Sequence, residues 1–198
     1  MGAEVELWLV RHGETEWSLS GKHTSRTDVP LTEKGRVRAA ELRDYLAGRS
    51  FDAVLTSPMQ RARETCAIAG YGDQARVEEG LREWDYGVYE GRTTKEIRET
   101  EPGWSVWKDP IQSGETVEHV GERADEVIGR VLDAVAGREH GRAILFAHAH
   151  ILRILAARWI DLPPRDGRLF ALGTGSLSVL GWERETRVIE SWNRQFEE

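Results

Sequence analysis

Arginine and histidine, two residue types that can bind and transfer a phosphoryl group, follow apolar runs at three places in this sequence. Arg11 and His12, then Arg61, then His148 each stand at or soon after the end of such a run. A guanidinium group can bind two oxygens of a tetrahedral anion, and a neutral histidine nitrogen can act as a nucleophile. We therefore expect these residues to form an anion-binding pocket that contains a nucleophile.

The elements that must position these residues can be read from the same runs. A short apolar run bounded by turn residues indicates a buried strand, and ligands bind at the carboxyl ends of strands in open α/β sheets. Gly13 allows the chain to turn sharply after His12. We expect Ser57 to cap a helix whose first residue is Pro58. That start would place Arg61 in the first helical turn, where the helix dipole favours an anion.

The alternation of strands and helices predicts a three-layer α/β/α sandwich around a mainly parallel sheet. Strands are expected at 5–10, 51–56, 74–79 and 143–147, a C-terminal β-hairpin at 176–182 and 186–192, and helices at 32–47, 58–70, 93–101, 117–137 and 151–159. The segments 15–30, 81–91 and 104–114 have no regular pattern. We expect them to be loops at the site, with a lid within the region 84–115.

Composition and charge narrow the class of protein. A chain of 198 residues can bury a complete core, so we expect a single domain over 1–198. The net charge of -7 argues against a nucleic-acid partner, and no apolar stretch is long enough to span a membrane. The single cysteine, Cys66, is expected to be buried and unreactive. Glu4 and Glu6 interrupt the N-terminal apolar run, so we expect no signal peptide and a cytoplasmic protein.

The residues alone leave three roles open. His148 and His150 could bind a metal, because histidines at alternate positions are a known ligand spacing, although no further ligand is adjacent in the sequence. Arg61 could be a surface residue of an arginine-rich helix. The proton donor that phosphoryl transfer needs could be Glu83 or a nearby acid, the candidates being Glu78, Glu79, Asp85 and Glu90.

Four motifs, in order and spread over most of the chain, resemble those of the histidine phosphatase (phosphoglycerate-mutase-like) superfamily. They are Leu9-Val10-Arg11-His12-Gly13-Glu14-Thr15, Ser57-Pro58-Met59-Gln60-Arg61-Ala62, Glu83 before Tyr86-Gly87 and Glu90-Gly91, and Phe146-Ala147-His148. The resemblance implies a flavodoxin-like fold and a reaction without metal or other cofactor. It also implies His12 as the phosphorylated nucleophile and Glu83 as the proton donor, with Arg11, Arg61 and His148 forming the phosphate pocket.

Two departures from the common family pattern point to one branch of the family. Ser18 stands where many members have an asparagine that contacts phosphate, and His150 stands where a small residue is usual. With these two residues the sequence resembles the branch of sedoheptulose-bisphosphatases and broad acid phosphatases. That resemblance implies a small sugar phosphate as substrate. We expect Ser18 to contact phosphate and His150, Thr24 and Trp17 to contact the rest of the substrate. His150 could meet a second phosphate or a sugar hydroxyl, whereas Trp17 also suits packing.

These observations predict a cytoplasmic phosphomonoesterase that acts through a phosphohistidine on a small phosphorylated metabolite, as a monomer or homodimer. The alternative is a phosphoglycerate mutase, which returns the phosphoryl group to a substrate. A non-catalytic module that binds phosphorylated ligands is a third interpretation. Such a module would be expected to lack the nucleophile or the acid, and both are present here.

Overall fold

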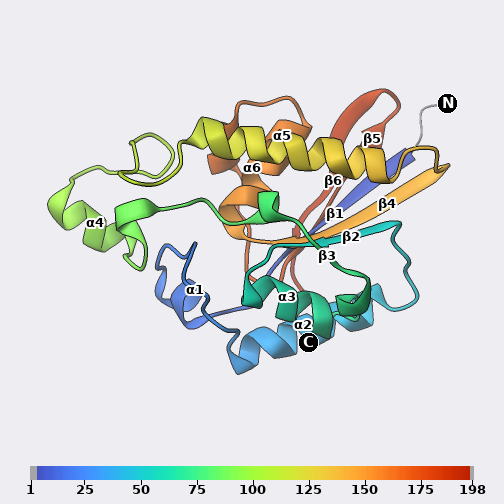
Figure 1. Cartoon of the computed structure of the whole chain (residues 1–198), viewed down its shortest axis with the longest axis horizontal. Coiled ribbons are helices and arrows are strands. Elements are labelled where there is room, and N and C mark those ends of the chain that lie inside the picture. Colours follow the sequence, from blue (N-terminus) through green and yellow to red (C-terminus); the bar gives the residue numbers. More distant parts are fainter. Residues whose placement is uncertain (1–3, 197–198) are drawn as a thin grey trace.

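The computed structural model describes residues 4–196, which contain one mixed sheet of six strands (Figure 1). The strands are β1 (Glu4–Arg11), β2 (Ala53–Thr56), β3 (Arg76–Val77), β4 (His140–Ala147), β5 (Leu177–Glu183) and β6 (Thr186–Arg194). They lie in the order β3-β2-β4-β1-β5-β6. The first four are parallel, whereas β5 is antiparallel to β1 and forms a hairpin with β6. The mainly parallel sheet and the C-terminal hairpin are thus confirmed.

Helices cover both faces of this sheet, as Figure 1 shows. One layer holds α5 (Val117–Ala134) and α6 (Ala149–Trp159), and the other holds α2 (Glu33–Leu46) and α3 (Gln60–Ile68). Successive residues of a strand point to opposite faces, so each central strand contributes to both layers. In β1, Leu9 packs in the α5–α6 layer and Val10 packs in the α2–α3 layer. The three-layer α/β/α architecture is therefore confirmed.

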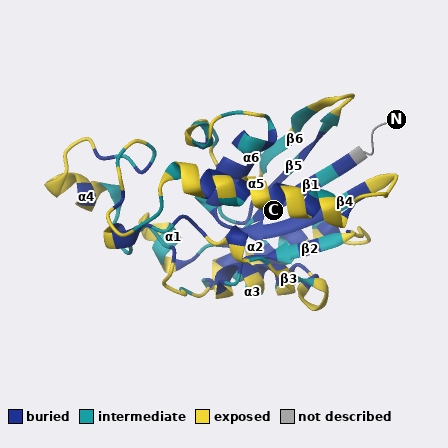
Figure 2. Cartoon of the chain, turned by 45° about the horizontal axis from the view of Figure 1, so that its top comes forward, coloured by how far each residue is buried: buried dark blue, intermediate teal, exposed yellow. Residues whose placement is uncertain are grey.

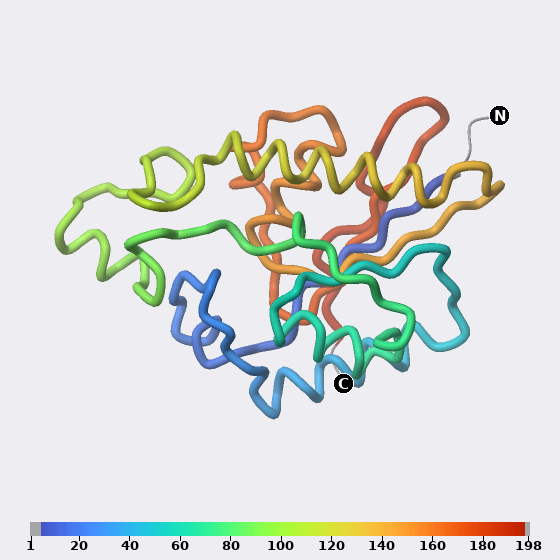
Figure 3. Tube along the Cα trace, viewed as in Figure 1, coloured from blue at the N-terminus to red at the C-terminus, as the bar shows by residue number. Residues whose placement is uncertain are grey.

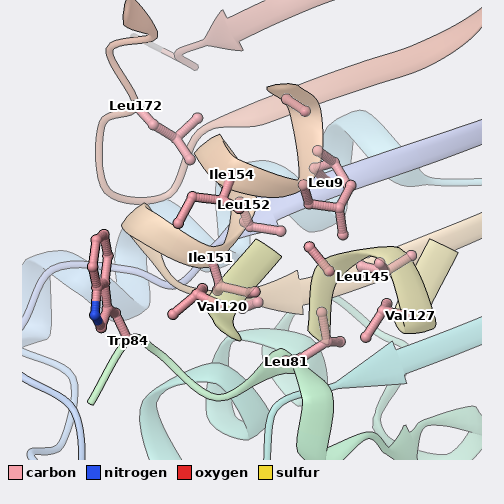
Figure 4. Packing of buried hydrophobic residues seen from close by; sticks show 14 of the residues in the cluster. Leu9, Leu81, Trp84, Val120, Val127, Leu145, Ile151, Leu152, Ile154 and Leu172 are labelled. Atoms are coloured by element: carbon pink, nitrogen blue, oxygen red, sulfur yellow. The ribbon is translucent and has the colours of Figure 1, made fainter. Parts of the chain in front are cut away.

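The longest helix, α5, is bound to the body of the molecule by one apolar stripe. Val120, Ala124, Val127 and Val131 recur at helical spacing and are fully buried. Figure 2 shows buried and exposed stretches alternating along this helix, and Figure 4 shows Val120 beside Ile151 of α6. The stripe docks α5 against α6, whose first turn lies at the carboxyl end of β4.

Short elements connect these layers. They are α1 (Glu16–Ser20), α4 (Thr94–Thr100) and the 3-10 helices η1 (Gly72–Gln74), η2 (Glu79–Leu81), η3 (Gly87–Tyr89) and η4 (Pro164–Leu169). Figure 3 traces the chain from η3 through α4 as it leaves the body of the molecule and returns to α5. Thr93 and Glu96 form the expected capping box of α4. Within the described part of the chain, no helix combines the length and the apolar character needed to cross a membrane.

The segment after β1 contains a helix that the sequence pattern does not predict. Instead of a continuous loop over 15–30, the chain forms α1 directly after Thr15. Ser18 N–H donates to the Thr15 hydroxyl at 3.0 Å, and Thr15 N–H donates to the Ser18 hydroxyl at 2.8 Å. This is a reciprocal capping box, but serine at its third helical position is a weaker signal than the usual glutamate or glutamine.

The expected start of α3 is wrong. The helix has Met59 as its N-cap, so neither Ser57 nor Pro58 belongs to its first turn. Ser57 stays bound to the sheet, because its N–H donates to a β4 carbonyl at 2.9 Å and its hydroxyl lies 2.7 Å from His148 Nε2. Arg61 nevertheless lies in the first turn of α3, as expected.

Candidate active site

Two glycines hold the turn after β1 in place. A Cβ on Gly13 would lie 2.5 Å from the carbonyl oxygen of Gly35, and a Cβ on Gly35 would lie 2.3 Å from that of Glu14. Gly13 N–H also donates to the hydroxyl of Thr65 in α3 at 3.1 Å. The turn is thus packed between α2 and α3, and it holds His12 at the carboxyl end of the sheet.

His12 is buried at this turn, and one of its tautomers is selected. Its Nδ1 lies 2.7 Å from the carbonyl oxygen of Gly13, which can only accept a hydrogen bond. Nδ1 must therefore carry the proton, so Nε2 of the neutral ring keeps its lone pair. Burial, followed by the charges of Arg61 and Arg11, lowers the pKa of His12 well below its usual value. The ring is thus neutral at physiological pH.

His148, the N-cap of α6, lies next to His12 and has the opposite tautomer. The two ring centroids are 5.1 Å apart. Arg61 Nε donates to His148 Nδ1 at 3.2 Å, so the ring proton is on Nε2, which donates to Ser57 Oγ at 2.7 Å. Burial, with a further contribution from Arg61, lowers the pKa of His148 well below its usual value. Both nitrogens are engaged, so His148 could join His150 on a metal only by breaking one of these bonds.

Arg61 is completely buried, and its guanidinium group is held from several sides. Besides the bond to His148, Nη1 donates to Thr27 O at 3.1 Å, and Nη2 donates to Thr24 O and Ser25 O at 3.3 Å each. These bonds use all but one of its N–H donors. The alternative of a surface arginine is therefore wrong.

A cavity of about 240 Å³ opens beside His12. Its wall includes most of the residues expected at the site, namely Arg11, His12, Ser18, Thr24, Glu83 and His150. His148 adjoins His12, and Arg61 adjoins His148, but neither is part of the wall. Trp17 packs over Gly91, also outside the wall. Two larger hollows, of about 670 and 630 Å³, contain none of these residues, and another of about 370 Å³ contains only Glu83 of them. Chemistry rather than size therefore identifies the site.

Glu83 belongs to the same wall and is bound by the N-terminus of α6. Its Oε1 accepts from Trp84 N–H and Ile151 N–H, and its Oε2 accepts from His150 N–H, each at 3.0 Å. The positive end of a helix dipole stabilises a negative charge at such a place. Among the described residues, Glu83 is the only carboxylate in this wall, so the neighbouring acids that the sequence left as candidates lie outside it.

The wall also contains residues that the sequence patterns did not indicate, among them Lys22, His23, Tyr86, Arg153 and Leu172. Tyr86 Oη is 2.6 Å from His150 Nδ1, and the ring centroids of His23 and Tyr86 are 4.7 Å apart. Burial lowers the pKa of His150 well below its usual value and that of His23 to about 4. His150 therefore offers a hydrogen bond rather than a positive charge. Arg153 could have been found from its helical spacing of three residues after His150, whereas the loop residues gave no such signal.

The balance of charge in the wall suits a phosphate. Arg11, Lys22 and Arg153 accompany the single carboxylate of Glu83. Arg11 Nη1 donates to the carbonyl of Leu172, while Arg11 Nε is buried and has no hydrogen-bond partner among the described residues. A buried N–H group without a partner is costly, so an anion that reached it would remove that cost.

The chain is similar to members of one family over most of its length. Residues 7–195 match the model of the histidine phosphatase superfamily, branch 1. The chain is 39% identical to an acid phosphatase of Mycobacterium tuberculosis, over 92% of this chain and 89% of that protein. It is 38% identical to a sedoheptulose 1,7-bisphosphatase of Saccharomyces cerevisiae, over 78% of this chain and 67% of that protein. A solved structure of an open reading frame product of M. tuberculosis has a TM-score of 0.90 and 37% identity, covering 97% of this chain and 98% of that one. The chain therefore belongs to branch 1 of the histidine phosphatase superfamily.

Proposed function

We propose that this protein is a phosphomonoesterase that transfers the phosphoryl group of a small sugar phosphate to His12 and then to water. The observation that carries the proposal is the tautomer of His12. Its Nδ1 proton is bound by the Gly13 carbonyl, so a neutral ring with a free Nε2 lone pair stands in the wall of a cationic cavity. The names of the relatives, an acid phosphatase and a sugar bisphosphatase, support hydrolysis of a sugar phosphate.

The proposed reaction has two displacements at phosphorus. A proton from solvent must first neutralise the Glu83 carboxylate. In the first displacement, His12 Nε2 forms a bond to phosphorus while the bond to the sugar oxygen breaks, and Glu83 gives its proton to that oxygen. In the second, water attacks the phosphohistidine, Glu83 accepts a proton from the water, and the bond between nitrogen and phosphorus breaks. The products are the alcohol and inorganic phosphate, and both side chains return to the states in which the first displacement began.

Fixed positive charge would stabilise the phosphoryl oxygens during both displacements. Arg11 lies in the wall beside His12. Ser18 lies there too, but its hydroxyl donates to Thr15 O at 2.9 Å, so a phosphoryl oxygen would have to replace that bond. Arg61 and His148 stand outside the wall, so we assign them to the support of this pocket. Because these groups can balance the charge, we propose that hydrolysis needs no metal and continues in EDTA.

The remainder of the cavity would hold the sugar. Thr24, Tyr86 and His150 bring hydroxyl and imidazole groups to this part of the wall. His150 is uncharged at neutral pH and bonded to Tyr86, which suits a sugar hydroxyl better than a second phosphate. Trp17 packs over Gly91, and its contact with substrate stays a prediction.

The test of this proposal is to trap the phosphoryl group on His12. After mixing with 32P-labelled sugar phosphate, rapid quenching in an alkaline denaturant and digestion without acid should give a base-stable, acid-labile adduct on the peptide that contains His12. His12→Ala should abolish the adduct and lower turnover by several orders of magnitude, as loss of a nucleophile typically does. His119→Ala, which changes an exposed histidine of α5, is the control and should keep both the labelled adduct and the wild-type turnover. Label on another residue, or near-normal turnover in His12→Ala, would overturn the mechanism.

A further inference from the structure

A second acid, Glu90, is bound to the loop that holds Arg61. Glu90 follows η3, outside the wall of the cavity. Its carboxylate accepts from Ser25 N–H at 2.9 and 3.0 Å through both oxygens and from Thr27 N–H at 3.0 Å through Oε1. All three contacts are with backbone N–H groups, so the carboxylate fixes the path of the chain over 25–27.

The same few residues bind the guanidinium group of Arg61 from the other side. The carbonyl oxygens of Thr24, Ser25 and Thr27 accept three of its hydrogen bonds. The peptide group that joins Thr24 to Ser25 takes part in both sets. Its oxygen accepts from Arg61 and its N–H donates to Glu90. One peptide group thus connects an anion to a buried cation, and each charge polarises the group in the direction that favours the other.

We propose that Glu90 is a positioning residue that holds Arg61, and through Arg61 the ring of His148, in the geometry that binds an oxyanion. The inference rests on the proposed function in one respect, namely that Arg61 and His148 support the phosphate pocket. The chain of contacts is continuous. Glu90 holds the loop, the loop holds Arg61 Nη1 and Nη2, and Arg61 Nε donates to His148 Nδ1, whose ring adjoins that of His12.

Burial gives this contact a physical purpose. Arg61 has no exposed surface, and a buried cation is costly unless it is hydrogen-bonded and accompanied by negative charge. Burial lowers the pKa of Arg61, and Glu83, Asp28 and Glu90 act in the opposite direction. Of these, Glu90 is the carboxylate that binds the same loop as Arg61. Loss of Glu90 would therefore let the loop move and would leave Arg61 less well held.

The experiment measures binding of inorganic phosphate by calorimetry in wild type, Glu90→Ala and Glu90→Gln. Glu90→Ala should raise the Kd for phosphate at least about tenfold, or about 1.4 kcal/mol. Glu90→Gln keeps an oxygen that can accept from Ser25 and Thr27 but loses the charge, so its Kd should rise by less. The control is Glu78→Ala, which removes a carboxylate that accepts from Gly80 N–H at 2.8 Å and pairs with Arg130 rather than with Arg61 or its loop. It should lower Tm without changing the Kd.

A double-mutant cycle separates positioning from a general loss of structure. If Glu90 acts through Arg61, Glu90→Ala should change the Kd less than about twofold in an Arg61→Ala background, because coupled residues are non-additive. If the fold-changes in Kd of the two single variants multiply in the double variant, the inference is overturned. A wild-type Kd in Glu90→Ala would overturn it as well. Should Glu90→Ala fail to fold, the folded Glu90→Gln provides the test. Either a wild-type Kd in Glu90→Gln, or fold-changes in Kd that multiply when Glu90→Gln is combined with Arg61→Ala, would overturn the inference as well.

Turnover adds a readout that separates positioning from proton donation. A positioning residue should lower kcat/KM by the same factor for alkyl and aryl phosphates, whereas an acid that protonates the leaving group should affect the alkyl phosphate more. A larger loss of kcat/KM for the alkyl phosphate than for the aryl phosphate in Glu90→Gln would overturn the inference. A wild-type protein that hydrolyses no phosphomonoester would contradict the proposed function. Because phosphate binding needs no turnover, the double-mutant cycle of Kd values would still decide whether Glu90 positions Arg61.

Discussion

The two adjacent histidines differ in which nitrogen carries the proton, and this difference separates their parts in the proposed reaction. His12 is protonated on Nδ1 by its bond to the Gly13 carbonyl, which leaves Nε2 free to attack. His148 is protonated on Nε2, and its Nδ1 is already bound by Arg61. Burial keeps both rings neutral, because the charged imidazolium form is penalised away from water. His12 is thus available as a nucleophile, and His148 is a fixed neighbour.

At the same scale, Glu83 should act on the leaving group. Glu83→Gln should lower kcat/KM for an alkyl phosphate such as glycerol phosphate by about 10²–10⁴, the usual contribution of a general acid. The loss for p-nitrophenyl phosphate should be smaller, since its leaving oxygen needs little protonation. Steady-state kinetics with both substrates measures the difference, and Glu79→Gln, an exposed residue paired with Arg82, is the control. Equal losses of kcat/KM on the two substrates would show that Glu83 does not protonate the leaving group.

At the scale of elements, the site is assembled where loops and helix ends meet the sheet. The first turn of α6 supplies two N–H groups to Glu83 and begins at His148. The turn after β1 lies against α2 because Gly13 and Gly35 have no side chains at the contact. The position of His12 therefore depends on the packing of a helix that contributes no side chain to the cavity wall.

Two helical glycines should respond in opposite ways to substitution by alanine. In Gly35→Ala the new methyl group would lie 2.3 Å from the carbonyl oxygen of Glu14, so the turn must shift. Unfolding in urea should show a loss of about 1–3 kcal/mol, typical of overpacking, with a lower kcat/KM as His12 moves. In α5, a Cβ on Gly129 would meet nothing within 4 Å. Gly129→Ala should gain about 0.5–1 kcal/mol and keep its activity. A neutral result for Gly35→Ala would show that the turn does not need this contact.

At the scale of the whole molecule, the chain between Glu83 and α5 forms one side of the site. Trp104, Val106 and Ile111 of this segment are buried in the same apolar cluster as α5 and α6. The segment also pairs with the loop after α1, where His23 N–H donates to Arg92 O at 2.9 Å and Gly91 N–H donates to His23 O at 2.8 Å. We propose that this segment is the lid expected within 84–115 and that it covers a small sugar phosphate together with the loop after α1.

We expect such a short cover to admit water, so hydrolysis should exceed transfer to a second substrate. A mutase must protect its phosphohistidine from water while the intermediate reorients. The comparison is release of inorganic phosphate against conversion of 3- to 2-phosphoglycerate, with and without 2,3-bisphosphoglycerate. Phosphate release should be the faster process. Isomerisation that exceeds it by about tenfold, or about 1.4 kcal/mol in favour of transfer, would establish the mutase instead.

The sequence by itself determined the order of the central strands and of the main helices, and the positions of the residues to which we assign the chemistry. Apolar runs and amphipathic spacing predicted the central strands and α5, because burial on two faces or on one stripe imposes a period on the local sequence. His12 and His148 could be placed at strand ends for the same reason. Helix starts were harder to predict. Ser57 and Pro58 have the residue types of a helix start, but Ser57 is bound by the sheet and His148 instead, and the helix begins after Met59.

Only the tertiary structure decided how these residues are used. Glu83 is distinguished from its acidic neighbours by N–H groups of α6, which belong to residues 67 and 68 positions away. The tautomers of the histidines depend on Gly13, Arg61 and Ser57, and no local spacing specifies such contacts. His23 enters the cavity because backbone pairing joins two loops that are remote in sequence. Local sequence specifies elements through periodic burial, whereas hydrogen bonds between distant segments exist only once the layers have packed.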